Sequence, residues 1–206
     1  MESLKCDFLI IGSGIASLRA AIELSDAGQV LILTKGEASQ GSTLFAQGGI
    51  AAAVGEEDAP SVHALDTITA GAGLCREDVV KTLTEDGPIY VNELIKWGAK
   101  FERHPNGKLD LAQEGAHRIR RVLHHRDATG KEICRVLWEQ AEKAKNLRIL
   151  ENALAVDIKV IENRCCGALF LDSQGRLNAV TANATLLATG GSGPVSYTHL
   201  TLPTKA

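Results

Sequence analysis

The segment from Cys6 to Gly14, which reads CDFLIIGSG, constrains the fold more than any other part of the chain. Its apolar run stops at two glycines, a helix-forming segment rich in small residues follows, and a second apolar run begins after Gly28. This order predicts a strand, a tight turn, a helix and a second strand, the unit that holds a dinucleotide pyrophosphate. Gly12 would allow the turn, Gly14 would let the backbone approach the phosphates, and the first helical N–H groups would face the anion.

The same glycine pattern also occurs in α/β turns that bind no ligand, so the plain turn stays open as an alternative. The third position of the pattern is Ser17, where glycine or alanine is usual, and a serine is small enough to keep helix and strand close. The second strand ends at Lys35 and Gly36 without the acid that often binds the ribose, and Glu37 follows. Either Glu37 takes that role or Lys35 and the backbone do, and Lys35 is equally compatible with a solvated turn.

Composition limits the class of protein. With 206 residues, of which 45% are hydrophobic and 4% aromatic, the chain is one domain or part of one. A net charge of −3 gives no general attraction to nucleic acid or to an anionic membrane. The 5 cysteines are odd in number and form no CxxC, which predicts reduced thiols and no metal site. The N-terminal apolar run is too short for a signal peptide or membrane span, so we expect a cytoplasmic protein.

The remaining pattern alternates helices and strands. We expect helices at 60–71, 78–97 and 131–145, and strands at 148–150, 153–161, 167–171 and 184–189. The first two helices are expected in the core, with a break or kink at Gly87-Pro88 and a cap at Gly98. Thr129 and Glu132 have the spacing of a capping box, and the turn at 172–175 predicts a hairpin. The fold class is therefore α/β and Rossmann-like, a parallel sheet with helices plus a small antiparallel β hairpin.

Two loops are candidates for ligand contact. Residues 41–49 combine glycines and polar residues with an apolar centre, which is typical of a loop packed against a flat ligand or of an ordinary buried turn. Residues 114–127 read EGAHRIRRVLHHRD, which allows a nucleic-acid patch, an exposed charged turn, or a pocket wall whose cations neutralise an anionic ligand. We favour the pocket wall because no aromatic residues are interleaved and the chain is slightly acidic. Glu114 among these cations would stay ionised and could receive a substrate ammonium.

Three motifs in this order, LIIGSGIAS, LTKGEASQGSTLFAQGGIAA and EGAHRIRRVLHHRDATGKEI, precede a strand that ends in ATGG. From about Asp7 to Gly191 the chain thereby resembles the N-terminal part of the L-aspartate oxidases, a family of the succinate dehydrogenase/fumarate reductase flavoprotein superfamily. The resemblance implies an incomplete FAD-binding domain. It further implies FAD-dependent oxidation of L-aspartate to iminoaspartate, with oxygen or fumarate as acceptor, as the first step of NAD biosynthesis through quinolinate. Quinolinate synthase is a candidate partner, and neither nucleic acid nor membrane is expected as one.

The resemblance also implies roles for individual residues. Glu114 would orient the amino group of aspartate. The residues expected around the FAD pyrophosphate are Gly12, Ser13, Gly14, Ile15 and Ala16, and those by the adenosine half are Lys35, Ala153 and Leu154. The residues expected beside the flavin are Ser42, Thr43, Leu44, Phe45, Ala46, Gln47, Gly48 and Gly49, with Thr189 and Gly190 at the end of the last strand. Ser42 stands where succinate dehydrogenases carry a histidine bonded to the flavin, which implies non-covalent FAD.

The chain departs from the family pattern at Ser17, at Arg118 and Ile119, and in length. We expect residues 1–193 to be the N-terminal part of the FAD-binding domain and residues 194–206 to be a non-native tail. Because the later substrate-binding part of the family is missing, we expect little or no turnover from these residues alone. Two other functions remain open: a succinate dehydrogenase or fumarate reductase type flavoprotein subunit, and a non-catalytic flavin-binding module.

Overall fold

A computed structural model describes residues 3–38 and 41–191. The chain divides into two compact units, one formed by Met1–Leu44 with Leu137–Ala206 and the other by Phe45–Val136. The tail expected from residue 194 lies outside the described residues, as do residues 39 and 40 of the second motif. In the described part of the chain, no helix is both long enough and apolar enough to cross a membrane.

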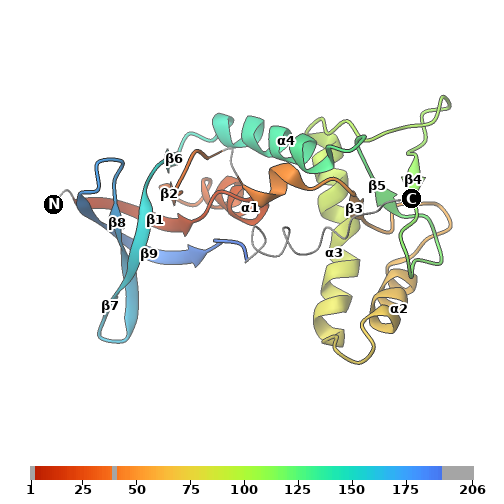
Figure 1. Cartoon of the computed structure of the whole chain (residues 1–206), viewed down its shortest axis with the longest axis horizontal. Helices are drawn as coiled ribbons and strands as arrows, with labels where there is room; N and C mark the ends of the chain where they lie inside the picture. The colour runs from red at the N-terminus through yellow and green to blue at the C-terminus, as the bar shows by residue number, and fades with distance from the viewer. Residues whose placement is uncertain (1–2, 39–40, 192–206) are drawn as a thin grey trace, which may run out of the picture. The chain divides into compact units, whose positions relative to one another are not determined.

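The first unit is built on a six-stranded sheet with the order β6-β2-β1-β9-β8-β7 (Figure 1). Its strands are β1 Ser3–Ile11, β2 Val30–Leu33, β6 Leu147–Leu150, β7 Leu154–Ile161, β8 Arg164–Leu171 and β9 Leu177–Leu187. The pairs among β6, β2, β1 and β9 are parallel, whereas β8 is antiparallel to both β9 and β7. The predicted α/β class, with a parallel sheet and an antiparallel hairpin, is therefore confirmed.

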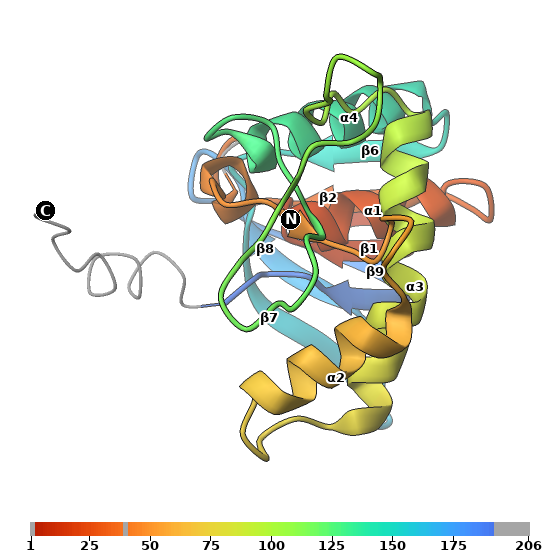
Figure 2. The ribbon, with the colours of Figure 1, turned by 90° about the vertical axis from the view of Figure 1, so that its right-hand side faces the viewer.

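The apolar runs of the sequence form the parallel centre of this sheet. All four residues of β2 are buried, as expected for a strand covered on both faces. Helix α1 Ile15–Leu24 connects β1 to β2 and packs on both strands (Figure 2). One face of the sheet carries a hydrophobic cluster that includes Leu9, Leu31 and Phe170.

Strand β9 is longer than the sequence pattern indicated. We expected a strand only at 184–189, but β9 begins at Leu177 and pairs with β1 along nearly its whole length. Its first half reads LNAVTAN, in which polar residues interrupt the apolar run. Pairing on both sides, with β1 and with β8, compensates for this weak local signal.

The second unit contains an antiparallel helix pair and a small sheet. Its elements are β3 Ile50–Ala51, α2 Pro60–Ala70, α3 Glu77–Lys96, β4 Leu111–Ala112 and β5 Val122–Leu123, and the sheet order is β3-β5-β4. The short 3-10 helix η1 Ser42–Phe45 and α4 Thr129–Lys143 each contain a boundary between the units. Helices α2 and α3 lie side by side (Figures 1 and 2).

Helix α3 matches the predicted range but not the predicted burial. It continues through Gly87 and Pro88, and it ends in a Schellman motif in which Gly98 has φ +96° and Ala99 N–H donates to Leu94 C=O (2.9 Å). The helix was expected in the core, but only one side of it is buried. Its exposed apolar residues include Val79, Leu83 and Ile89, and its buried residues are Val80, Thr84, Val91 and Leu94.

The predicted capping box before α4 is also wrong. Thr129 is the first residue of the helix, and its hydroxyl accepts a hydrogen bond from the backbone N–H of His125 (3.0 Å). The Glu132 carboxylate accepts one from the backbone N–H of Lys100 (2.7 Å) and pairs with Arg135. Both side chains therefore connect the helix start to preceding loops instead of satisfying the first helical N–H groups.

Candidate functional site

The glycine turn is held between the ends of two parallel strands. The Gly12 N–H donates to Leu33 C=O and the Ala188 N–H donates to Ile11 C=O, each at 2.8 Å. Gly12 has φ +116°, and a Cβ at this position would overlap the Ala188 carbonyl oxygen and lie 3.1 Å from Thr189 Cα. Only glycine fits here, because any side chain would clash with the backbone at the end of β9 and adopt an unfavourable φ.

The start of α1 offers unpaired N–H groups. No described residue accepts a hydrogen bond from the backbone N–H of Ser13, Gly14 or Ala16, and Ile15 N–H makes only a long contact with Thr43 Oγ1 (3.4 Å). The helix has no side-chain N-cap bond and no acid in its first turn. Its positive end is therefore uncompensated and fits the pyrophosphate of a dinucleotide cofactor.

The serine at the third position of the glycine pattern has a structural explanation. Ser17 is buried, and its hydroxyl donates to the Gly12 carbonyl oxygen at 2.6 Å. A glycine or alanine would leave this carbonyl without that bond. Ser13 and Thr34 hydroxyls also lie within hydrogen-bond distance, 3.1 Å apart, so polar side chains link the turn to the end of β2.

Five of the segments predicted to contact the cofactor lie wholly or partly in the first unit, where neighbouring segments approach one another. Thr43 Oγ1 lies 3.7 Å from the position that a Cβ on Gly14 would take, and Thr189 adjoins Gly12. Just after β2, the Thr34 carbonyl oxygen accepts a hydrogen bond from the Ala153 N–H (2.8 Å). This bond brings Ala153 beside the segment that carries Lys35. The Lys35 side chain is exposed, Ala153 is buried, and Leu154 is partly exposed.

The rest of the predicted flavin loop adjoins Glu114 in the second unit. Residues 45–49 are exposed, and Glu114 Oε1 lies 3.9 Å from the position that a Cβ on Gly48 would take. Gly49 has φ +147°, and a Cβ there would lie 2.5 Å from Val122 Cγ1. The glycines thus let this loop pack on β5 and bring its backbone close to the Glu114 carboxylate.

The expectation that residues 114–127 form a wall of free cations is wrong for two arginines. Arg121 is fully buried, and its guanidinium donates to both carboxylate oxygens of Asp58 (2.8 and 3.0 Å) and to Asp66 (2.9 Å). Arg118 donates to Asp66 through its backbone N–H (3.1 Å) and its Nε (2.5 Å). Burial raises the pKa of Asp66, but these hydrogen bonds from Arg118 and Arg121 outweigh it and the net pKa is lowered.

Asp58 and Asp66 were not among the residues that the sequence pattern predicted to be functional. A weak signal existed, because Asp66 lies within an apolar stretch of the predicted helix at 60–71, where an unpaired acid would be costly. Arg120 is exposed and remains available as a cation.

Two histidines lie beside this charged network. The rings of His63 and His117 meet edge to face with centroids 5.8 Å apart, and neither Nδ1 has a hydrogen-bond partner among the described residues. Burial, followed by the positive charge of Arg121, lowers the pKa of His63. The His63 ring is therefore predominantly neutral near pH 7.

Known proteins resemble this chain over nearly all of its length. Residues 7–205 match the FAD binding domain family. L-aspartate oxidase from Streptomyces coelicolor is 44% identical over 200 residues, 94% of this chain and 34% of the relative, and L-aspartate oxidase 2-b from Nicotiana tabacum is 39% identical over 97% of this chain and 32% of the relative. The chain thus spans about one third of the length of these relatives.

A solved structure, that of a variant of the E. coli quinol fumarate reductase FrdA, superposes with a TM-score of 0.91 at 29% identity. The superposition covers 95% of this chain and 34% of that one. It agrees with the observed parallel sheet and its antiparallel extension. Together with the family match and the uncompensated amides at the glycine turn, this means that the chain belongs to the FAD binding domain family, and FAD is its cofactor.

Proposed function

We propose that this chain is the N-terminal third of an L-aspartate oxidase, a cytoplasmic enzyme that oxidises L-aspartate to iminoaspartate with oxygen or fumarate as acceptor. The product would enter quinolinate and NAD biosynthesis, with quinolinate synthase as a candidate partner. The observation that carries the proposal is the identity of 37–44% to bacterial and plant L-aspartate oxidases over 92–97% of the chain. Residues 1–193 would form the first part of the FAD-binding domain, and residues 194–206 would be a non-native tail.

The proposed cofactor contacts follow from the chemistry of each segment. The N–H groups at Ser13 to Ala16 would bind the pyrophosphate, because the start of α1 carries a partial positive charge. Lys35 with Ala153 and Leu154 would contact the adenosine half, and residues 42–49 with Thr189 and Gly190 the flavin side. When bound, FAD supplies the two-electron acceptor for the hydride of the aspartate α-carbon. Ser42 has no imidazole with which to form a covalent flavin bond, which supports non-covalent binding.

Glu114 would hold the substrate ammonium. Its carboxylate is exposed and adjoins the backbone of Gly48, on the loop proposed to contact the flavin. An ionised carboxylate at this position would orient the amino group by a charge-assisted hydrogen bond. A dicarboxylate without an amino group gains nothing from it, so Glu114 favours an amino-acid oxidase over a dicarboxylate oxidoreductase.

The second candidate is a fumarate reductase or succinate dehydrogenase type flavoprotein, which is favoured by the superposition on the E. coli quinol fumarate reductase. The third is a flavin-binding module without catalysis. The complete protein, purified with FAD, distinguishes the three. In an L-aspartate oxidase, L-aspartate reduces and bleaches the flavin, and oxygen then reoxidises it with release of hydrogen peroxide. A dicarboxylate enzyme is not bleached by aspartate but, once its flavin has been reduced with dithionite, passes the two electrons to fumarate. A binding module is yellow, is not bleached by aspartate, and does not reduce fumarate after dithionite treatment.

The role of Glu114 has a separate test in that complete protein. Glu114→Gln should lower kcat/KM for L-aspartate by about 10- to 100-fold, because a hydrogen bond to a charged group contributes about 1.5–3 kcal/mol. FAD binding should not change. Glu85→Gln, an exposed glutamate on α3, is the matched control. The 206-residue chain itself should bind FAD but show little or no turnover, because the later substrate-binding part of the family is missing from it. Ready release of peroxide by this chain would contradict that expectation.

A further inference from the structure

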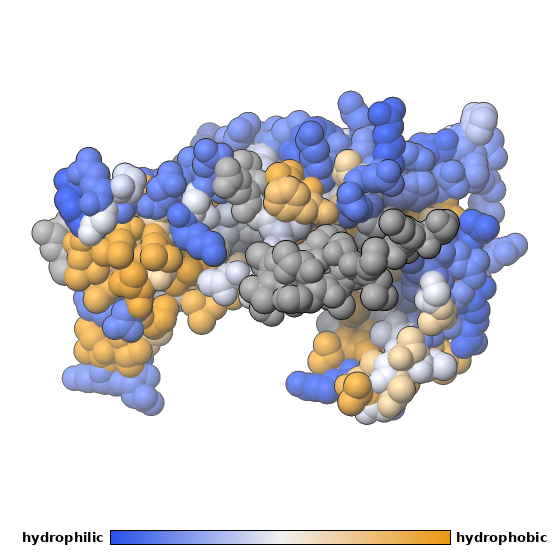
Figure 3. Space-filling view, viewed as in Figure 1, coloured by the Kyte–Doolittle hydropathy of each residue, from blue (hydrophilic) through white to orange (hydrophobic). Residues whose placement is uncertain are grey.

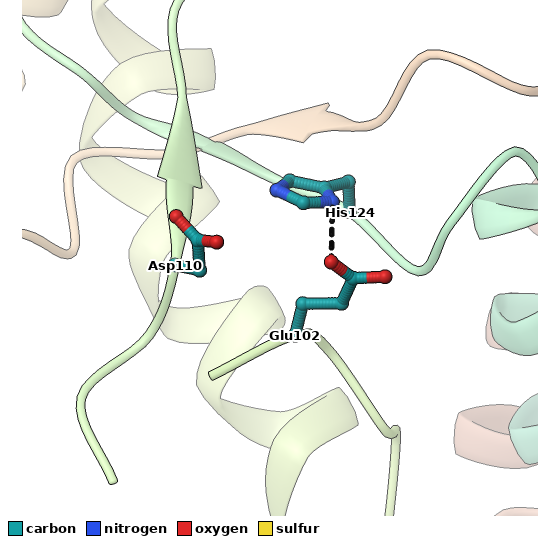
Figure 4. A group of neighbouring side chains, drawn as sticks. All are labelled: Glu102, Asp110 and His124. Carbon is teal, nitrogen blue, oxygen red and sulfur yellow. Dashed lines mark ion pairs between the residues drawn. The ribbon is translucent and has the colours of Figure 1, made fainter. Parts of the chain in front are cut away.

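Three side chains of the types that ligate metals converge in the second unit, and none of them is a residue proposed to contact FAD. They are Glu102, Asp110 and His124, and one ligand atom of each lies within 4.8 Å of the other two (Figure 4). Glu102 follows α3, Asp110 immediately precedes β4, and His124 immediately follows β5. All three residues are partly buried, and nothing in the proposed function uses them.

Backbone hydrogen bonds hold these three segments together. The Glu102 N–H donates to His124 C=O, and the Asp110 N–H donates to Glu102 C=O, each at 2.9 Å. The Glu102 carboxylate is oriented further, because its Oε1 accepts a hydrogen bond from the backbone N–H of Arg126 (2.9 Å). Backbone groups therefore hold the three segments in place and orient the Glu102 carboxylate. Hydrogen bonds to the ligands of known metal sites orient those ligands in a similar way.

The distances in the cluster are long for direct hydrogen bonds. His124 Nδ1 lies 3.5 Å from Glu102 Oε2, and His104 Nε2 lies 3.5 Å from Asp110 Oδ1. Hydrogen bonds of this kind are usually about 2.7–3.2 Å long. Two ligands bonded at about 2.1 Å to a tetrahedral ion lie about 3.4 Å apart. The separation of 3.5 Å between His124 Nδ1 and Glu102 Oε2 is therefore close to the edge of a tetrahedral coordination sphere, and the Asp110 ligand atom lies within 4.8 Å of both.

We propose that Glu102, Asp110 and His124 bind a divalent transition-metal ion of the zinc class. One imidazole and two carboxylates form a donor set that zinc accepts, whereas magnesium and calcium prefer oxygen ligands alone. His104, which is half exposed and already faces Asp110, supplies a fourth donor after a small side-chain movement. The ion would join the end of α3 to the small sheet and stabilise the second unit.

The test is titration of the purified, EDTA-treated 206-residue chain with Zn²⁺ by isothermal titration calorimetry, with Co²⁺ absorption as a report on ligand geometry. We expect one saturable site and a higher thermal midpoint with Zn²⁺. Glu102→Gln and Asp110→Asn should each weaken binding by at least about 100-fold, because even outer-shell partners contribute about 10- to 100-fold. His104→Gln should weaken it by about 10-fold or more.

Glu57→Gln removes an exposed carboxylate of the same unit and is the matched control, which should bind Zn²⁺ like the parent. Circular dichroism in EDTA checks that each variant folds. If either Glu102→Gln or Asp110→Asn fails to fold, the other variant still tests the site by itself. Absence of a saturable Zn²⁺ site in the parent would overturn the proposal, and so would parental affinity in Glu102→Gln and Asp110→Asn. Two ordinary ion pairs would then explain the cluster.

Discussion

Gly12 and Gly14 are separated by one residue but are required for different reasons. Gly12→Ala should lower the free energy of unfolding by about 3 kcal/mol or more, because the new Cβ would combine backbone strain with a clash against the end of β9. Gly14 has ordinary φ and ψ (−76°, −174°) and space for a Cβ. Gly14→Ala should therefore keep its stability but lose FAD, because the methyl group would point into the space proposed for the phosphates. Denaturant unfolding and flavin absorbance after gel filtration measure the two effects, and equal loss of stability in both variants would contradict this assignment.

Arg121 is a structural residue within a sequence motif that otherwise suggests ligand binding. Arg121→Met should lower the free energy of unfolding by about 3–5 kcal/mol, because it leaves the buried carboxylates of Asp58 and Asp66 without their main partner. Urea unfolding of the parent and variant checks this value. Arg76→Met is the matched control, since Arg76 and Asp78 form an exposed pair, and it should have little measurable effect. A mild effect of Arg121→Met would mean that the network is not important for stability.

At the scale of an element, helix α3 and its cap contain two glycines with opposite requirements. Gly87 lies within the helix, and a methyl group added there would meet nothing within 4 Å, so Gly87→Ala should stabilise the protein by up to about 1 kcal/mol. Gly98 also has open space but adopts φ +96°, so Gly98→Ala should destabilise it by about 1 kcal/mol or more. Thermal unfolding of the two single variants tests the contrast, and the same sign for both would show that helix propensity and cap geometry do not govern this helix.

At the scale of the whole molecule, the first unit leaves an apolar edge strand uncovered by the residues described. Strand β7 ends its sheet, and its exposed residues include Val156, Val160 and Ile161. Apolar side chains gather over β7 to β9 in Figure 3. Exposed edges of this kind favour strand pairing between molecules, so we expect the 206-residue chain to self-associate.

Val160→Lys should weaken this association by at least about tenfold, since burial of a valine contributes about 1.5 kcal/mol or more. Sedimentation equilibrium over a range of protein concentrations measures the change. Thr82→Lys adds the same charge on the exposed surface of α3 and is the control. A chain that stays monomeric, or that associates equally after Val160→Lys, would exclude the edge as the contact.

The sequence by itself determined the features that depend on neighbouring residues. The glycine turn, the buried strand β2, the Pro60 start of α2 and the Gly98 cap all follow from local backbone geometry and from short apolar runs. The same local signal identified the N–H groups at the start of α1 as an anion site, because a helix terminus has its partial charge wherever it lies.

Tertiary structure alone decided which charges and which apolar faces are paired. The neighbours of Arg121 in sequence do not distinguish it from Arg120. Its partners Asp58 and Asp66 are more than 50 residues away in the chain, on α2 and the loop before it, and only the fold brings them to Arg121. The exposure of Leu83 and the central position of β9 likewise depend on partners distant in the chain. The physical reason is that burial and ion pairing are properties of non-local contacts, whereas turns, caps and helix termini are set by the dihedral angles of a few consecutive residues.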